Sequence, residues 1–413
     1  MGIPRWFYGW TIVGAVFTIL FLIFSAAYTF SAVFPSLSAE FDASRASVSL
    51  IFSIAAFLYF GLGAISGPLG DRIEPKWVVG FGVVVIAAGL VVAATAERLW
   101  QVYAGYGIGI GVGVGFAYVP AVSALQRWFN VRRGFASGLA IAGIGVGTLC
   151  APPAAAVLIE WSGWRATYLL LAIAVLIVGL GASALLESAP QQRGLQPDGA
   201  PSGPGSRPTM DGASPREALT SRTFWLMYVA TVFVSLGLFV PFVHLVPFAL
   251  DNGMTARTGA ILIGAIGVGS TFGRFLIGGL ADRHGRMRVF VGCFAGLGAM
   301  SLIWFATVNP WVLGAFALGF GLFYGGWVAL APAVLADYFG VRSLGSIIGA
   351  LYSSVGIGTL FGPPLAGYAF DTWQSYDVPI LVGAVTGFIG AAIASMIPHP
   401  NGPAEKHSAN RAT

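Results

Sequence analysis

Long apolar runs, separated by short charged segments, follow one another along the whole chain. Runs such as 10–34 and 260–280 are apolar on every side, as helices that contact lipid and one another must be. Each run is close to the roughly 20 residues that a membrane helix needs. The pattern predicts twelve transmembrane helices, over residues 8–34, 47–70, 77–96, 100–126, 135–159, 166–187, 222–250, 257–281, 288–307, 311–336, 343–369 and 378–397.

The composition excludes a soluble globular protein. Of the 413 residues, 57% are hydrophobic and only 9% are charged, against about 25% charged residues in soluble domains. The two cysteines, Cys150 and Cys293, lie inside apolar runs, so we expect buried thiols without a disulfide or metal. The apolar runs contain no Ser/His/Asp set, metal cluster or carboxylate pair. We therefore expect no enzyme activity and no cofactor.

The positions of the basic residues predict the orientation in the membrane. Alternate loops place 16 Lys and Arg residues on the side of both termini and four on the other side: Arg45, Arg98, Arg165 and Arg257. The positive-inside rule then places both termini of a multi-pass protein in the cytoplasm. We expect the membrane to be a cell membrane, of the bacterial inner or plasma type. The same bias explains the net charge of +5 without a nucleic-acid partner.

An internal repeat divides the chain. Residues 67–72 (GPLGDR) recur as 278–283 (GGLADR), and residues 147–153 recur as 358–364, both after 211 positions. Between the repeats, residues 188–215 are rich in Pro, Gly and Ser without apolar periodicity. We predict an all-α membrane protein with two pseudo-symmetric six-helix halves, 1–187 and 220–397, a disordered cytoplasmic linker, 188–219, and a cytoplasmic tail, 398–413. Two parallel six-helix repeats are a transporter architecture, with the site near the midplane between the halves.

Two motifs resemble known families. The pattern Gly-x-Leu-x-Asp-Arg-x-Gly-Arg, complete over 278–286, resembles the signature of the major facilitator superfamily. Residues 128–143 are similar to the fifth-helix signature of monocarboxylate transporters, although Trp128, Val131 and Phe135 replace its Tyr, Lys and Leu. The first-helix signature survives only as residues 8–10, without its acidic residue. The resemblance implies the prokaryotic branch, which includes oxalate/formate exchangers.

Arg274 is the one basic residue that falls deep inside a predicted helix. An arginine at that depth costs roughly 2.5 to 3.5 kcal/mol on insertion scales, and the acidic residues all lie at the ends of predicted spans, in loops or in the linker, where none can pair with it inside the membrane. The repeat maps Arg274 onto Gly63, so the scaffold does not require it. We expect it to bind the carboxylate of an anionic substrate, since a guanidinium fork matches that group; the resemblance implies the same role. The alternative is that it binds backbone carbonyls or reaches Asp282.

A single intramembrane cation favours a monocarboxylate. Related dicarboxylate exchangers use a lysine on the eleventh helix, and residues 343–369 contain none. Proton-coupled relatives carry an Asp four residues before the arginine and a lysine on the first helix, whereas this chain has Ser270 and no such lysine. His244 titrates near neutral pH, so we expect it to contact substrate and, with Arg274, to couple a proton. Its alternative is a neutral residue bonded to a helix carbonyl.

Further candidates are polar groups deep in the helices and charges at the loops. Tyr118 and Tyr324, and more weakly Tyr28 and Tyr352, either contact the substrate or bond between helices. The repeated loop motif predicts an inner gate in which Asp71 pairs with Arg72, and Asp282 with Arg283 and Arg286. The alternative for these five charges is solvated turns.

The sequence as a whole predicts a secondary transporter that works by alternating access, in a lipid bilayer and as a monomer. Its expected partners are a small monocarboxylate anion, of lactate or pyruvate size, and a proton. An exchanger of the oxalate/formate type is the main alternative. A membrane receptor is disfavoured, because neither the linker nor the tail is long enough to form a signalling domain.

Overall fold

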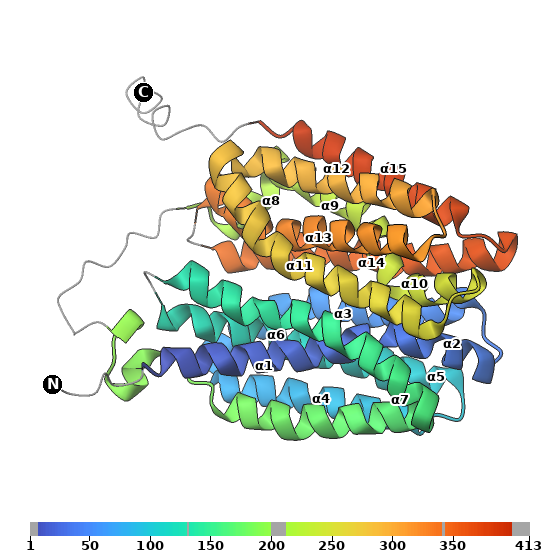
Figure 1. Cartoon of the computed structure of the whole chain (residues 1–413). Helices are drawn as coiled ribbons and strands as arrows, with labels where there is room; N and C mark the ends of the chain where they lie inside the picture. Colours follow the sequence, from blue (N-terminus) through green and yellow to red (C-terminus); the bar gives the residue numbers. More distant parts are fainter. Residues whose placement is uncertain (1–6, 130–131, 200–211, 341–342, 399–413) are drawn as a thin grey trace.

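The computed structural model describes residues 7–129, 132–199, 212–340 and 343–398. These residues form helices, with one isolated bridge between Gly212 and Gly340 as their only β pairing. Two helical bundles lie against each other, the N-terminal half coloured blue to green and the C-terminal half yellow-green to red (Figure 1). The expected all-α membrane architecture is confirmed.

The N-terminal half contains one helical segment that is too long for a single crossing. As one straight helix, the 52 residues of α7 would measure about 78 Å, more than twice the roughly 30 Å of a bilayer core. Gly163 (φ 77°, ψ 165°) interrupts the helix, and the ribbon of α7 turns back on itself in Figure 1. The segments of this half are α1 (Gly9–Tyr28), α2 (Phe30–Glu40), α3 (Arg45–Arg72), α4 (Pro75–Ala94), α5 (Leu99–Val102), the π-helix η1 (Tyr103–Ile108), α6 (Gly109–Trp128) and α7 (Arg133–Ala184).

The helices of the C-terminal half follow the same order as those of the N-terminal half. The C-terminal segments are α9 (Arg222–Leu238), α10 (Val240–Asp251), α11 (Ala256–His284), α12 (Arg286–Phe305), α13 (Pro310–Phe339), α14 (Leu344–Trp373) and α15 (Asp377–Ser395). Helices α11, α12, α13 and α14 begin 211 residues after α3, α4, α5 and α7. The repeat seen in two sequence motifs therefore extends over the fold.

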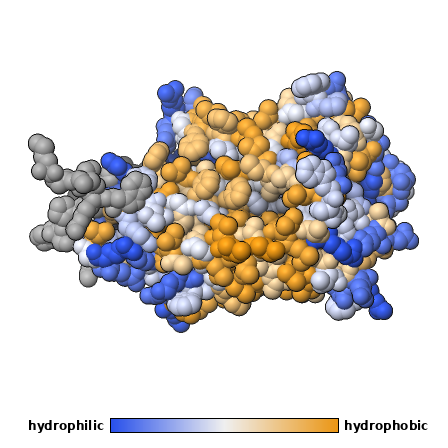
Figure 2. All heavy atoms as spheres, turned by 60° about the horizontal axis from the view of Figure 1, so that its bottom comes forward, coloured by the Kyte–Doolittle hydropathy of each residue, from blue (hydrophilic) through white to orange (hydrophobic). Residues whose placement is uncertain are grey.

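The helices are long and apolar enough for the predicted crossings. Eleven segments qualify as membrane spans among the described residues, and one of them, 135–184, contains the turn at Gly163. The first span reaches Glu40, six residues beyond the prediction, because the chain stays helical through Pro35 after a short break at Thr29. An apolar band crosses the middle of the face in Figure 2, and hydrophilic residues lie at both ends. The chain is a multi-pass membrane protein.

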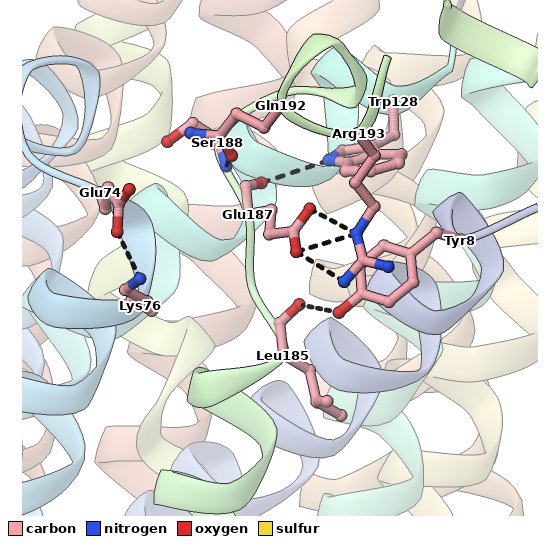
Figure 3. A network of polar contacts seen from close by, with 9 residues as sticks. All are labelled: Tyr8, Glu74, Lys76, Trp128, Leu185, Glu187, Ser188, Gln192 and Arg193. Atoms are coloured by element: carbon pink, nitrogen blue, oxygen red, sulfur yellow. Dashed lines mark hydrogen bonds and ion pairs between the residues drawn. The ribbon is translucent and has the colours of Figure 1, made fainter. Parts of the chain in front are cut away.

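Both flanks of the linker are folded, contrary to the expectation of disorder. They form the turns η2 (Pro190–Arg193) and η3 (Pro197–Gly199) and the short helix α8 (Pro215–Thr220). Arg193 donates to both carboxylate oxygens of Glu187 and lies 3.5 Å from the ring centre of Tyr8, whose hydroxyl donates to Leu185 (Figure 3). On the other flank, Ala213 N–H donates to the carbonyl of Phe339. Each flank is thus anchored to its own half, while residues 200–211 lie outside the described part.

Helices α3 and α14, which pack against each other across the halves, approach most closely at the end opposite the linker, here called the Arg45 end. A Cβ atom placed on Gly367 of α14 would lie 2.6 Å from the backbone nitrogen of Ala46 in α3. Toward the linker end of the same helix pair, a Cβ on Gly349 would lie 3.7 Å from Ala64, and one on Gly345 would meet nothing within 4 Å. The bundle is therefore closed at the Arg45 end and loosens toward the linker end.

Candidate functional site

Arg274 lies on α11 and faces the other half. Its Nη1 donates a 2.6 Å hydrogen bond to the carbonyl of Ile141 on α7. The residue is only 8% exposed, and its Nε and Nη2 atoms are buried without a hydrogen-bond partner. None of the ion pairs among the described residues involves it. Part of the alternative is therefore correct, since one nitrogen binds a backbone carbonyl, but two nitrogens of a buried cation remain unused.

Four tyrosines surround this guanidinium. Tyr28 of α1, Tyr118 of α6, Tyr324 of α13 and Tyr352 of α14 all interact with Arg274 electrostatically. The hydroxyls of Tyr28 and Tyr324 lie 3.3 Å apart and join the two halves. Five of the six side chains predicted to contact substrate thus gather at one place between the halves.

Tyr59 is a member of this cluster that the sequence reading missed. It lies on α3, interacts electrostatically with Tyr324, and its buried hydroxyl has no hydrogen-bond partner. The ring of Tyr28 stacks on Phe242 of α10 at 4.9 Å. Aromatic residues are frequent throughout this chain, so their number gave no signal for Tyr59; only the position of α3 against α1 identifies it.

The arrangement offers donors in excess of acceptors. The free Nε and Nη2 of Arg274 form one edge of the guanidinium, which suits the two oxygens of a carboxylate. The neighbouring tyrosine hydroxyls can donate to a further oxygen. Since unsatisfied buried donors cost free energy, this centre is suited to a small anion that brings several acceptor atoms.

His244 belongs to a different cluster, at the Arg45 end. Its Nε2 lies 2.8 Å from the carbonyl of Pro363, and its Nδ1 lies 3.1 Å from the hydroxyl of Tyr376. A carbonyl only accepts, so Nε2 carries the proton and the hydroxyl of Tyr376 donates to Nδ1. Burial raises the pKa of Tyr376, which keeps that hydroxyl protonated. The hydroxyl in turn accepts a 2.6 Å hydrogen bond from Arg45.

Arg45 connects this cluster to both halves. Its guanidinium donates two hydrogen bonds, of 2.5 and 2.7 Å, to the carboxylate of Asp251 at the end of α10. Both ring nitrogens of His244 are occupied, and its electrostatic partners are Arg45 and Asp371 rather than Arg274. The prediction that His244 contacts the substrate is therefore not supported by this geometry, because the residue lies in the closed end of the interface.

Comparisons with known proteins agree with this architecture. The fold resembles a bacterial homologue of the human lysosomal transporter Spinster, in inward-facing unoccupied and occupied conformations. The TM-scores are 0.71 and 0.69, at 16% and 17% identity over 96% and 97% of this chain and 98% of each of those chains. The Major Facilitator Superfamily profile matches residues 16–318 and 227–413.

Sequence relatives narrow the family. Monocarboxylate transporter 11 of Homo sapiens is 30% identical over 96% of this chain and 84% of its own length. Monocarboxylate transporter 3 of Rattus norvegicus is 30% identical over 91% of this chain and 77% of its own length. The chain belongs to the monocarboxylate transporter family of the major facilitator superfamily. This transporter is accordingly a carrier and not an enzyme.

The predicted inner gate of the transporter lies at its linker end. The side chain of Asp71 falls outside the described part, and Arg72 and Arg283 are exposed. Arg286 lies 4.0 Å from Asp282 and donates a 2.7 Å hydrogen bond to Asp337 of α13. These contacts stay within the C-terminal half, so in this conformation Arg286 braces its own half. Its role in closing the inner side remains a prediction.

Proposed function

We propose that the protein carries small monocarboxylates together with a proton, by alternating access, with Arg274 as the carboxylate ligand. The observation that carries this proposal is the buried guanidinium edge of Arg274, whose Nε and Nη2 have no partner. An incoming carboxylate supplies both acceptors and the missing negative charge. The gathering of Tyr28, Tyr118, Tyr324 and Tyr352 around the same group supports a site here.

The residues around Arg274 favour one carboxylate over two. Helix α14, which faces the site through Tyr352, has no Lys or Arg along its length. A second carboxylate would therefore find no second cation on this helix. The tyrosine hydroxyls suit one additional oxygen beside the carboxylate, as in a 2-hydroxy or 2-oxo acid of lactate or pyruvate size.

Proton coupling is proposed to pass through His244 rather than through a carboxylate next to Arg274. Position 270, one turn before Arg274, is a serine whose buried hydroxyl has no partner. His244 is the fully buried histidine of the described spans, and imidazole is the side chain best suited to exchange a proton at physiological pH. A second proton on its ring would remove the acceptor to which the hydroxyl of Tyr376 donates, and would add a positive charge beside Arg45. Protonation of His244 therefore weakens the closed contact at the Arg45 end.

We assign the linker end to the cytoplasm of a bacterial-type cell membrane, because most Lys and Arg residues lie there. Closure at the Arg45 end then corresponds to an inward-facing state. One chain contains both halves and the whole Arg274 cluster, which supports a monomer as the working unit.

Uptake into proteoliposomes tests the proposal. Labelled lactate, pyruvate and oxalate are offered with and without an inward proton gradient, to wild type and to Arg274→Gln. Arg257→Gln is the matched control, since Arg257 lies on the same helix and is exposed. We expect gradient-stimulated uptake of monocarboxylates that Arg274→Gln abolishes and Arg257→Gln retains.

Two results would contradict parts of the proposal. Uptake that requires carboxylate preloaded inside, and ignores the proton gradient, would identify an exchanger of the oxalate/formate type. His244→Gln tests the proton route, with His284→Gln as control because His284 is exposed at the linker end of α11. Unchanged proton stimulation in His244→Gln would remove His244 from that route and leave the role of Arg274 intact.

A further inference from the structure

The two halves end their first spans on matched acidic residues. Glu40 closes α2 and Asp251 closes α10, and the two positions are 211 residues apart. Both lie at the Arg45 end of the bundle. If the repeat also extended to the charged residues, each acidic residue would pair with a cation at the equivalent position of its own half.

Glu40 is neutralised within its own half. Arg165, near the turn inside α7, forms an ion pair with one carboxylate oxygen of Glu40. Trp164 donates a 2.6 Å hydrogen bond to the other oxygen. Arg165 also donates to the carbonyl of Ala96, so it is fixed on the N-terminal half. Movement of one half against the other leaves all of these contacts unchanged.

Asp251 has no such cation in its own half. The position 211 residues after Arg165 is Tyr376, which is neutral. Its cation is instead Arg45, at the start of α3 in the other half, whose own counterpart is Ala256. Arg257, next to that counterpart, is exposed and forms no ion pair with Asp251. The C-terminal half thus has Tyr376 where the N-terminal half has Arg165, and Asp251 pairs with Arg45 of the N-terminal half instead.

A second acid strengthens the same junction. Asp371 of α14 accepts hydrogen bonds from the backbone N–H groups of Arg45 and Ala46, both at 3.0 Å, and so caps the first turn of α3 across the interface. The guanidinium of Arg45 lies 3.6 Å from the ring centre of Phe370. Glu160, which stands 211 residues before Asp371, is exposed. Hydrogen bonds from the N-terminus of α3 to Asp371 thus join α3 and α14 across the halves. In the equivalent helix pair of the repeat, α11 and α7, Glu160 forms no ion pair among the described residues.

We infer that Arg45 and Asp251 form a latch between the halves, which holds the Arg45 end closed and must break whenever that end opens. Opening leaves Asp251 without a cation of its own half and removes Asp371 from the N–H groups of Arg45 and Ala46, whereas Glu40 keeps Arg165 throughout. The side chains of Arg45 and Asp251 are 19% and 30% exposed, so the pair is only partly screened by water. The latch is a positioning device: it sets the balance between the two access states and does not touch the substrate.

Distances between spin labels measure this balance directly. One pair of labels, at positions 97 and 372, reports the Arg45 end, and a second pair, at 77 and 288, reports the linker end; all four residues are exposed. The labels are placed in a chain lacking Cys150 and Cys293. Arg45→Gln and Asp251→Asn should each raise the population with a separated Arg45 end by about tenfold, since one charge-assisted hydrogen bond is worth at least that factor.

Matched controls separate a latch from a general loss of structure. Arg165→Gln breaks the pair within one half and should move neither distance. Arg45→Lys, which keeps the charge, should shift the population less than Arg45→Gln. The double variant, Arg45→Gln with Asp251→Asn, should shift the population no further than Arg45→Gln alone, because the pair is already broken in that single variant. In every shifted variant the linker-end distance should shorten as the other lengthens.

Two results would overturn the latch. The first is an unchanged distance at the Arg45 end in both Arg45→Gln and Asp251→Asn. The second is an equal shift in Arg165→Gln. If Arg45→Gln does not fold, Asp251→Asn decides alone, because it breaks the same pair and leaves the first turn of α3 intact.

Discussion

Two arginines lie between the halves of this transporter, and they differ in what their nitrogens contact. Arg45 donates to Asp251 and to Tyr376 and lies over the ring of Phe370. Arg274 donates to one backbone carbonyl, and its Nε and Nη2 contact no acceptor. The guanidinium of Arg45 is therefore bound by protein groups, whereas that of Arg274 has two nitrogens without a hydrogen-bond partner.

This difference indicates two roles: one arginine stabilises an arrangement of the halves, and the other binds a ligand. A saturated ion pair across an interface stabilises one arrangement of the halves and breaks when they move. A buried cation with free donors is costly by itself, and it persists where a ligand completes it. We therefore assign to Arg45 the balance between the two access states, and to Arg274 the recognition of the substrate.

The largest effect should follow from Arg274. Arg274→Gln should weaken monocarboxylate binding by at least about 30-fold, because removal of one partner from a buried charged pair costs about 2 to 5 kcal/mol. Arg274→Lys should recover only part of this, since lysine keeps the charge but loses the planar fork. Titration calorimetry on purified protein measures both. Equal binding by wild type and Arg274→Gln would contradict the assignment.

Arg45 should affect turnover more than binding. In Arg45→Gln, steady-state uptake should fall by about tenfold, as one state of the cycle loses its latch. Affinity should change by no more than the shift in the population that binds. Uptake rates and calorimetry on the same preparation separate the two quantities. A loss of affinity in Arg45→Gln as large as that in Arg274→Gln would show that Arg45 also belongs to the substrate site.

Single tyrosine hydroxyls should contribute less. Tyr28→Phe and Tyr118→Phe should each weaken binding by about 2- to 10-fold, the range expected for one neutral hydrogen bond of about 0.5 to 1.5 kcal/mol. Tyr168→Phe is the control, because Tyr168 is as buried as Tyr28 but stacks on Tyr106 within the N-terminal half. A control variant that weakens binding as much would show that the tyrosines act through packing alone.

The smallest effect is expected at the linker. The hydrogen bonds that Arg193 donates to Glu187 raise the pKa of Arg193, but the pair is partly exposed to solvent and braces one half only. Arg193→Gln should lower the free energy of unfolding by less than about 1 kcal/mol and leave uptake unchanged. Thermal denaturation in detergent and the uptake assay measure the two. A change in uptake would show that the linker anchor influences the movement of the halves.

The sequence predicted the fold well because membrane helices depend on local composition. All twelve crossings and the 211-residue repeat follow from apolar runs and two motifs, and the helices of the structure begin within a few residues of the prediction. Arg274 was also accessible to sequence reasoning, since a charge inside an apolar run is conspicuous without knowledge of its neighbours.

The rest depends on which helix faces which. Arg45 reads as one of four charges on the outer side, and nothing in the sequence indicates that Asp251 and Asp371 converge on it from the other half. His244 reads as a buried titratable residue near a substrate path, but its ring contacts Tyr376, which follows more than 130 positions later. Contacts between distant segments decide both roles, and a single sequence does not specify them.

One measurement tests the central claim most directly: calorimetric titration of purified wild type and Arg274→Gln with a monocarboxylate and with its primary amide, which has a similar shape and no charge. If Arg274 is completed by the carboxylate, wild type binds the acid and not the amide, and Arg274→Gln binds neither. Equal binding of acid and amide by wild type, or retained binding of the acid by Arg274→Gln, would contradict the account.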